Sequence, residues 1–394
     1  MTSSMAVDDV THETTTAMAM DLNEKKSRLL VPVVVFAGLF LIVGILGNLL
    51  VCFICGCRLR QNVTNTFVFS LAAVDLVSCV LCIPVDIAEL RMPYSFSFPA
   101  FCKLLRTVRS VTTVSSGLIL VAIAVERYRR ICRPLARHTS VLQARWISLS
   151  AVLLGVVFAW PAAILFGNKT VVVVGSQTNF TECSVQDALH DSVYPVVFYS
   201  LLLLLFFGTF TILCVLYLLI AVKIWKGRKF RSDANRGRSD SLPTATLFSA
   251  KSNSPSEVTD EKYVVEAEQI STLLRRKTFL FPVNPGDTLK RKKRTYSRKR
   301  TTFIMFLMTV TFLVSCLPYV VVAICRFVFD DMETSLPDFG VVAFHFSLKS
   351  FILSSAINPF IYGFCSLKFK QECRVLLRDI QCVKKDDDVN SSTS

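Results

Sequence analysis

The sequence predicts an all-α membrane protein, a bundle of seven transmembrane helices followed by an amphipathic eighth helix. Of its 394 residues, 52% are hydrophobic and only 19% are charged, which is a membrane composition. Seven apolar runs approach or exceed the roughly 20 residues that cross a bilayer core. Positive charge gathers between alternate runs, as it does in the cytoplasmic loops of membrane proteins.

The seven apolar runs divide the chain. Five contain no charged residue: Leu29–Cys57, Ser110–Val125, Trp146–Asn168, Ser192–Val222 and Thr301–Cys325. The second run, Phe67–Val85, is interrupted only by Asp75, and the seventh, Val341–Leu367, only by Lys349. We therefore expect a tail over residues 1–28, five helices within 29–225, a long and mostly disordered loop over 226–299, two helices within 300–365, and an amphipathic helix with a tail over 366–394.

Charge predicts the orientation of the bundle. The stretch from Lys223 to Arg300 holds 20 Lys and Arg against 8 Asp and Glu, whereas the loops on the other side are acidic. Basic loops stay in the cytoplasm, so we expect a multi-pass protein of the plasma membrane with its N-terminus outside and its C-terminus inside. A basic patch beside membrane spans faces anionic lipid and cytosolic partners, which argues against nucleic acid as a partner.

The second outer loop carries the features of an extracellular segment. Among the cysteines, only Cys102 and Cys183 lie on the outer side away from a span centre, and an oxidising exterior favours a disulfide between them. The β-rich run 171–174, a turn cluster and the run 179–183 predict a hairpin. Asn168 and Asn179 each begin a glycosylation sequon on this face.

The chain after the seventh span is amphipathic. Apolar and basic positions alternate at helical spacing from Leu367 to Leu377, which suits a helix lying on the inner membrane surface. Cys373 and Cys382 are placed there for palmitoylation. For Cys382, an unmodified thiol is an equally good interpretation.

Several polar residues lie in mid-span, where ionisable groups are unfavourable and mark function by default. One interpretation is a hydrated cluster that holds a sodium ion through oxygen ligands; the other is a hydrogen-bonded packing network without an ion. No other cofactor and no other metal is expected. The cluster comprises Asn48, Asp75, Ser116, Ser354 and Asn358.

Two motifs near the cytoplasmic side indicate movement. Asn358-Pro359-Phe360-Ile361-Tyr362 places a proline inside the seventh run, which predicts a bend at that point. Glu126-Arg127-Tyr128 closes the third run, where an arginine can be held by a neighbouring carboxylate and released to another partner. The alternative for Arg127 is an ordinary boundary arginine that snorkels to the surface.

The outer third of the bundle is rich in charge. Four basic residues there suit a carboxylate, a sulfate or an acidic peptide side chain, and the acids Asp86 and Glu89 oppose them. The alternative is that Arg109 and Asp86 pair with each other, because buried charges are usually paired. The basic residues are Arg106, Arg109, Arg326 and Lys349.

Taken in order, these motifs resemble the rhodopsin-like G-protein-coupled receptors. The resemblance runs from Leu29 to Cys373, the long inner loop excepted, and rests on Gly47-Asn48, Asp75, Cys102, Glu126-Arg127-Tyr128, Pro134, Cys183, Phe312 with Pro318, and Asn358-Pro359 with Tyr362. It implies a receptor that binds an extracellular ligand and activates a heterotrimeric G protein, with arrestin and receptor kinases as further partners. The family pattern assigns contact with the G protein to Arg127, Leu135, Tyr217 and Tyr362, once the sixth helix swings outward about Phe312, Cys316 and Pro318.

The chain departs from the family pattern at three informative places. Cys316 stands where the family usually has a tryptophan, and Arg298 stands where some members carry an acid that locks the arginine of the third span. Arg109 occupies the position of the aspartate in amine receptors, so a cationic amine is disfavoured. The hairpin loop and the run Glu126–Leu135 look like those of neuropeptide receptors, of the cholecystokinin or orexin type.

Other classes of function stay open as alternatives. A receptor for a small anionic metabolite or lipid is the nearest, and a membrane transporter or channel is remote because no inverted repeat is apparent. With four histidines in no metal-ligand spacing, the sequence shows no catalytic constellation, and we do not expect an enzyme.

Overall fold

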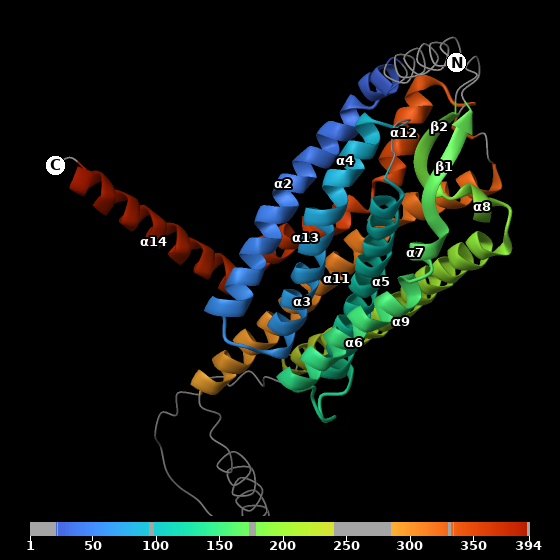
Figure 1. The fold of residues 1–394 in the computed structure, drawn as a ribbon. Helices are drawn as coiled ribbons and strands as arrows, with labels where there is room; N and C mark the ends of the chain where they lie inside the picture. The colour runs from blue at the N-terminus through green and yellow to red at the C-terminus, as the bar shows by residue number, and fades with distance from the viewer. Residues whose placement is uncertain are drawn as a thin grey trace, which may run out of the picture. The chain divides into compact units, whose positions relative to one another are not determined.

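The computed structural model describes residues 21, 23–93, 98–172, 179–239, 285–329, 332–333 and 335–391. The chain divides into two compact units, one formed by Met1–Val222 with Thr302–Ser394 and the other by Lys223–Thr301. The first unit contains the helical bundle (Figure 1).

Six helical stretches of the described chain are long and apolar enough to cross a membrane. The first is α2 (Val31–Phe53) with a π-helical turn (Ile54–Arg58), and the second joins α3 (Val63–Val77), the π-helical turn Ser78–Cys82 and α4 (Ile83–Arg91). Next come α5 (Pro99–Cys132), α6 (Val141–Ala159) with the short α7 (Ala162–Leu165), α9 (Val193–Ser239) and α11 (Pro285–Val328). The seventh is a bent pair, α12 (Asp338–Leu348) and α13 (Ile352–Cys365), so the predicted seven-span bundle is confirmed.

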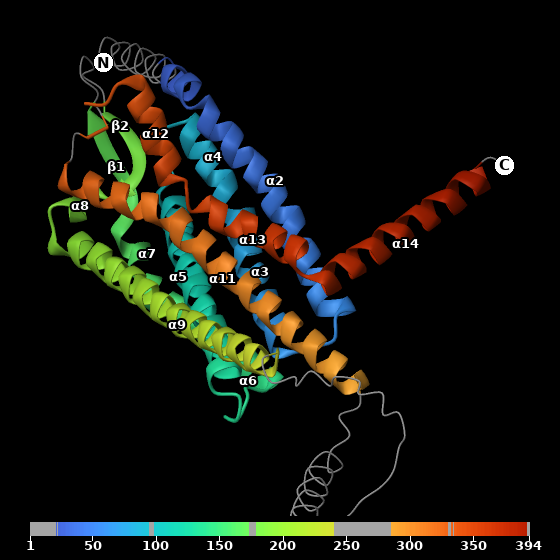
Figure 2. The same cartoon turned by 180° about the vertical axis from the view of Figure 1, so that it is seen from behind.

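The seventh span turns sharply before it reaches its proline. Pro359 lies inside helix α13, whereas α12 and α13 meet at 58° across Lys349–Phe351 (Figure 2). The sequence motif did not indicate this turn, which lies about nine residues before Pro359, and a bend at Asn358-Pro359 itself stays a prediction. The physical reason is that side-chain contacts to other spans hold the turn at 349–351, as described below.

Two helices extend beyond the expected ends of their spans. Helix α9 continues to Ser239 and α11 begins at Pro285, so helix covers 226–239 and 285–299 of the expected loop. Lysine and arginine, which are abundant there, are good helix formers. Residues 240–284, including the apolar run 263–281, lie outside the described chain.

The second outer loop is a β-hairpin, as predicted. Strand β1 (Phe166–Val172) pairs antiparallel with β2 (Asn179–Val185), and Asn168 lies opposite Cys183. The predicted disulfide joins Cys183 to Cys102, with the two Cα atoms 5.6 Å apart. It fastens the hairpin to the outer end of α5, and the short α8 (Asp187–His190) follows.

The bundle is packed inside and apolar outside. The largest buried cluster joins α2, α3, α5, α6, α11 and α13 around Phe67, Leu120 and Met308. By contrast, Val35, Leu39 and Leu46 on α2 are more than half exposed, as expected for side chains that face lipid.

Helix α14 (Leu367–Ser391) follows α13 after a single residue and diverges from it (Figure 1). Phe369 is buried with its ring 5.1 Å from that of Tyr362, and Arg58 pairs with Asp379 at 3.0 Å. A helix therefore occupies the expected place, while its position on the membrane surface stays a prediction.

Candidate functional site

Five charged side chains from α4, α5 and α12 form a continuous chain of ion pairs in the outer third of the bundle. Arg106 Nη2 lies 3.2 Å from Glu89 Oε1, and Glu89 Oε2 lies 3.1 Å from Lys349 Nζ. Lys349 also pairs with Asp86, which in turn lies 2.5 Å from Arg109 Nη2. We call this set the charge ladder.

Local helix geometry positions four of the five members. Asp86 and Glu89 are three residues apart on α4, and Arg106 and Arg109 are three apart on α5, so each pair shares one helix face. Lys349 directly follows α12, as the residue that caps its C-terminal end. Because Glu89 is three residues after Asp86 on the same helix, its place in the site can be predicted from the sequence.

The charge ladder is deeply buried at one end and more open at the other. Asp86 is fully buried and Lys349 and Arg109 nearly so, whereas the Arg106 side chain is 22% exposed. The Arg109 guanidinium also lies over the Phe351 ring, 4.8 Å from its centroid. Arg109 is therefore paired internally with Asp86, which is the arrangement that the alternative interpretation expected. The side chain of Arg326 lies outside the described part of the chain.

The hairpin covers the open end of the charge ladder. Arg106 donates a hydrogen bond to the Cys183 carbonyl of β2 at 3.0 Å, and its guanidinium lies 5.7 Å from the Phe166 ring centroid of β1. The three cations of the ladder exceed its two anions by one charge. The ladder as a whole therefore carries a net positive charge, and Arg106 is its most exposed cation.

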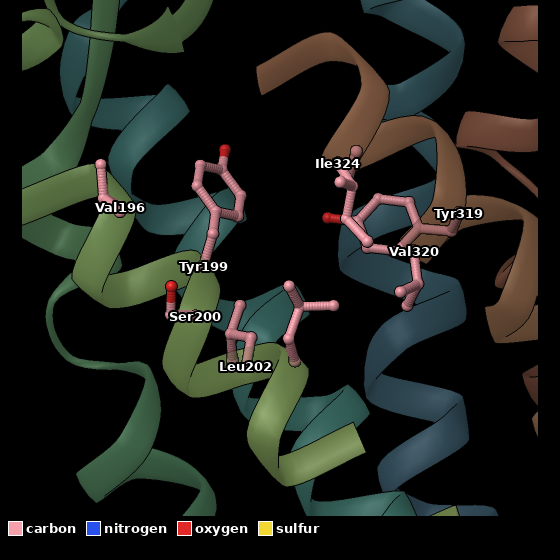
Figure 3. A pocket seen from close by; sticks show the side chains of 9 residues that line it. Val196, Tyr199, Ser200, Leu202, Tyr319, Val320 and Ile324 are labelled. Atoms are coloured by element: carbon pink, nitrogen blue, oxygen red, sulfur yellow. The ribbon is translucent and has the colours of Figure 1, made fainter. Parts of the chain in front are cut away.

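A cavity of about 110 Å³ opens between the outer halves of α9 and α11. Its walls are mostly apolar, and the side chains of the two helices face each other across it (Figure 3). The ring of Tyr319, one of its lining residues, is 5.7 Å from the Phe351 ring that contacts Arg109. This cavity could not be predicted from the sequence, because apolar residues in a span are the ordinary case. Its polar lining residues are Tyr199, Ser200 and Tyr319.

The predicted polar cluster is largely assembled in mid-bundle. Asp75 accepts hydrogen bonds from Asn358 Nδ2 at 2.8 Å and from Ser116 Oγ at 3.4 Å. Asn48 donates to the Ser355 carbonyl at 2.9 Å. Ser354 instead donates to the carbonyl of Phe351, so its hydroxyl bonds its own helix.

The oxygen atoms of this cluster suit a hard cation. The buried Oδ1 atoms of Asn48 and Asn358 have no hydrogen-bond partner, and both residues line a cavity of about 10 Å³. Such a space is close to that of one water-sized probe, and amide and carboxylate oxygens are the donors that hard cations prefer. No group of three or more His, Cys, Asp or Glu residues that suits a metal occurs in the described chain.

Comparison with known proteins decides the family. The family described as "7 transmembrane receptor (rhodopsin family)" matches residues 47–362. The chain belongs to the rhodopsin family of seven-transmembrane receptors. The family is one of receptors rather than of enzymes, and it gives no support to the transporter or channel alternative.

Several relatives of the receptor are peptide receptors by name. The cholecystokinin receptor of Xenopus laevis is 24% identical over 362 residues, which cover 86% of this chain and 75% of the relative. The neuromedin-U receptor 2 of Mus musculus is 25% identical, covering 89% and 76%. The gastrin/cholecystokinin type B receptor of Canis lupus familiaris is 27% identical, covering 89% and 79%. The predicted resemblance to the neuropeptide-receptor branch is confirmed.

Near the C-terminal end of α5, Glu126 and Arg127 have separate partners. Glu126 accepts hydrogen bonds from Arg130 Nε at 2.5 Å and from Thr139 Oγ1 at 2.7 Å. Arg127 is buried and donates to Thr64 Oγ1 of α3. The sequence pattern alone gave no sign of Thr64 or Thr139, because a threonine near a span end is unremarkable.

The other predicted switch residues surround this arginine or lie near it in the chain. The Tyr217 hydroxyl is 3.2 Å from Thr309 Oγ1, and the Tyr362 hydroxyl donates to Asn65 Oδ1 at 3.2 Å. Tyr128 is half-buried, and Leu135 is 100% exposed in the loop that follows α5. A fully exposed leucine is available to an apolar contact on a partner.

The predicted hinge residues of the sixth span lie in α11. Phe312 and Cys316 are both buried in the main core cluster, and Pro318 is inside the helix. A Cβ atom at Gly117 of α5 would lie 3.4 Å from the Phe312 ring, so α5 and α11 approach closely here. The side chain of Arg298 lies outside the described part of the chain.

The predicted modification sites are only partly described. Asn168 is half-buried in β1 with its Oδ1 atom buried, and the side chain of Asn179 lies outside the described part. Cys373 is a half-buried free cysteine on α14, where burial raises the pKa of its thiol. The side chain of Cys382 lies outside the described part. Glycosylation and palmitoylation at these positions stay predictions.

A second charged cluster lies at the outer rim. Lys26 Nζ is 2.6 Å from Glu333 Oε1, and His345 Nε2 of α12 is 3.1 Å from the same oxygen. Burial alone raises the pKa of Glu333, but the hydrogen bond with His345 and the Lys26 charge lower it below the usual range of a glutamate. The cluster links the start of the first span to the loop before α12.

Proposed function

We propose that this protein is a plasma-membrane receptor for an extracellular peptide and that it activates a heterotrimeric G protein. The observation that carries the proposal is the charge ladder beneath the disulfide-fastened hairpin, in a chain whose relatives are named as cholecystokinin and neuromedin-U receptors. The exposed Leu135 and the buried Arg127 support the G-protein contact on the other side.

The charge ladder also favours a chemical class of ligand. Its single excess cation and the exposed end at Arg106 favour one anionic group, such as a carboxylate or a sulfate. A cationic amine would meet like charge and is disfavoured. An acidic peptide side chain or a peptide carboxylate satisfies this requirement, and so does the anionic head of a small metabolite or lipid.

A screen on cells expressing the receptor separates these ligands. Calcium and cyclic AMP are measured after addition of cholecystokinin peptides, neuromedin-U peptides, a neuropeptide library and a panel of fatty acids. We expect a peptide to give a response that Arg127→Ala abolishes at equal surface expression. Responses to fatty acids alone would establish the lipid alternative, and silence to all peptides at normal surface expression would contradict the proposal.

The active peptide then tests the role of Arg106. Replacing its acidic groups one at a time by carboxamides should lower potency at one position, since a truncated buried charge pair costs about 2–5 kcal/mol. The Arg106→Gln receptor should respond equally to the acid and to that carboxamide. If none of these carboxamide replacements lowers the potency of the peptide, the proposed contact between Arg106 and an anionic group is contradicted.

We further infer a sodium ion as an allosteric ligand of the polar cluster. The support is the pair of buried oxygens on Asn48 and Asn358, two residues that line the 10 Å³ cavity, together with the carboxylate of Asp75, which Asn358 bonds. A sodium ion bound there would link helices α2, α3 and α13 through the oxygen atoms of these three side chains. Signalling that responds equally to sodium and to choline in the medium, before and after Asp75→Asn, would contradict this.

The remaining partners are inferred from the family. Arrestin and receptor kinases are proposed as cytoplasmic partners, and membrane lipid is proposed as the surface for α14. The basic residues of α14 and the half-exposed Cys373 support contact with an anionic membrane face.

A further inference from the structure

The bend of the seventh span begins at Lys349, the member of the charge ladder that pairs with both of its acids. Lys349 follows the last residue of α12. Its backbone N–H donates to the carbonyl oxygen of His345 at 3.0 Å, and its nitrogen lies 3.2 Å from the carbonyl oxygen of Phe346. Its side chain crosses to α4, where it meets both Asp86 and Glu89. We propose that Lys349 holds the seventh span in its bent resting conformation, and that releasing this side chain from α4 activates the receptor.

The next residue of the bend is fastened to a different span. Ser350 Oγ lies 2.7 Å from the Ser315 carbonyl oxygen of α11 and 2.8 Å from the Ser347 carbonyl oxygen, so its single hydroxyl proton is within reach of both acceptors. Both Lys349 and Ser350 are buried. Two consecutive residues therefore tie the 58° bend to the second and sixth spans, and these contacts, rather than a proline, account for the bend.

The helix beyond the bend carries groups of the intracellular switch. Helix α13 has 14 residues and contains Asn358, which bonds Asp75, and Tyr362, which bonds Asn65. A change of angle at Lys349–Phe351 displaces α13 as a unit, because its own hydrogen bonds hold it together. The bend thus connects a charged outer site to the inner contacts through one continuous element, which is a physical route for coupling.

The ladder is arranged so that the Lys349 contact can break without leaving a buried acid unpaired. Without Lys349, Asp86 keeps Arg109 at 2.5 Å and Glu89 keeps Arg106 at 3.2 Å. The four charges that stay paired then sum to zero, and the released ammonium group of Lys349 turns to water or to an anionic group of the ligand. The contact that holds the bend is therefore separable from the pairs that keep the charged interior stable, which is what a switch requires.

The test uses ligand-independent signalling and needs no ligand. Basal G-protein activation is measured in cells expressing the full receptor or Lys349→Met, at matched surface amounts. We expect Lys349→Met to raise basal activation at least about fivefold, the lower end of typical coupling between sites. Lys103→Met, at the outer end of α5 and outside the ladder, serves as the matched control and should have no effect.

Two further variants make the result decisive. Adding Arg127→Ala to Lys349→Met should return the signal to that of untransfected cells. Ser350→Ala, which removes one hydroxyl from the bend, should also raise basal activation. If Lys349→Met is retained inside the cell, the result for Ser350→Ala decides the proposal. Basal activation that is unchanged or lowered in the surface-expressed variant overturns the proposal.

This inference rests on the proposed G-protein coupling but not on the peptide ligand. If no peptide activates the receptor while Lys349→Met raises the basal signal, the ligand assignment fails and the role of Lys349 stands. If a peptide activates the receptor and the Lys349 and Ser350 variants leave the basal signal unchanged, the ligand assignment stands and the role of Lys349 fails.

Discussion

One buried aspartate, Asp86, organises the charges of the outer third. It is fully buried and accepts from both Arg109 and Lys349, two cations from different spans. Because a buried carboxylate without partners is strongly unfavourable, each of these contacts supports the folded state. Arg109 therefore contributes to stability even where it does not touch a ligand.

Arg109→Ala should destabilise the receptor by about 3 kcal/mol, because it removes a buried ion pair and the cation above Phe351. Thermal unfolding of the purified receptor measures this, with Arg145→Ala on the exposed face of α6 as the control. Asp86→Asn combined with Arg109→Gln should recover part of the loss, since neither partner is then an unpaired charge. An Arg109→Ala receptor that melts like the control would show that the pair contributes nothing.

Glu126 and Arg127 are neighbours with separate partners, and this predicts how their variants differ. Thr64→Val removes the hydrogen bond that holds Arg127, an interaction with a charged group that contributes about 1.5–3 kcal/mol, so basal signalling should rise. Glu126→Gln disturbs Arg130 and Thr139 instead and should leave basal signalling near its resting level. A G-protein activation assay at matched surface amounts compares them. A large rise for Glu126→Gln with none for Thr64→Val would reverse the assignment.

Among the elements, the hairpin depends on a single covalent tie. The Cys102–Cys183 disulfide holds β2 against the outer end of α5, and Arg106 binds the carbonyl of the same Cys183. The geometry of the ladder's open end is therefore coupled to the disulfide.

Cys102→Ser should lower the stability of the receptor by about 2–5 kcal/mol and reduce its surface amount. The double variant Cys102→Ser with Cys183→Ser should match the single variant, because either change removes the same bond. Cys214→Ser, a free and half-buried cysteine of α9, is the control. Thermal unfolding and surface staining that leave Cys102→Ser equal to this control would contradict a structural role for the disulfide.

The elements also show what sequence reasoning can reach. The spans were predictable because lipid requires long apolar helices, and the hairpin because β-branched runs flank a turn cluster. The bend at Lys349–Phe351 was not, since it has no proline or glycine and arises from contacts with α4 and α11. For the same reason, the separate partners of Glu126 and Arg127 depend on residues distant in the chain.

For the whole molecule, charge asymmetry and burial lead to one orientation. The ladder, the hairpin and the disulfide lie at the end of the bundle where the loops are acidic, and Arg127 with the exposed Leu135 lies at the basic end. The disulfide requires an oxidising compartment, which agrees with the charge rule. The charge rule and the disulfide therefore both favour the proposed orientation, with the ladder on the outer side.

Epitope tags test this orientation directly. A tag before Met1 should stain on intact cells, because the N-terminus is expected outside. A tag after Ser394 should stain only after the membrane is permeabilised, and so should one inserted within 240–284. Since both proposals assign the charge ladder to the extracellular side, staining of the C-terminal tag on intact cells would overturn the ligand pocket, the G-protein contact and the direction of coupling through Lys349 together.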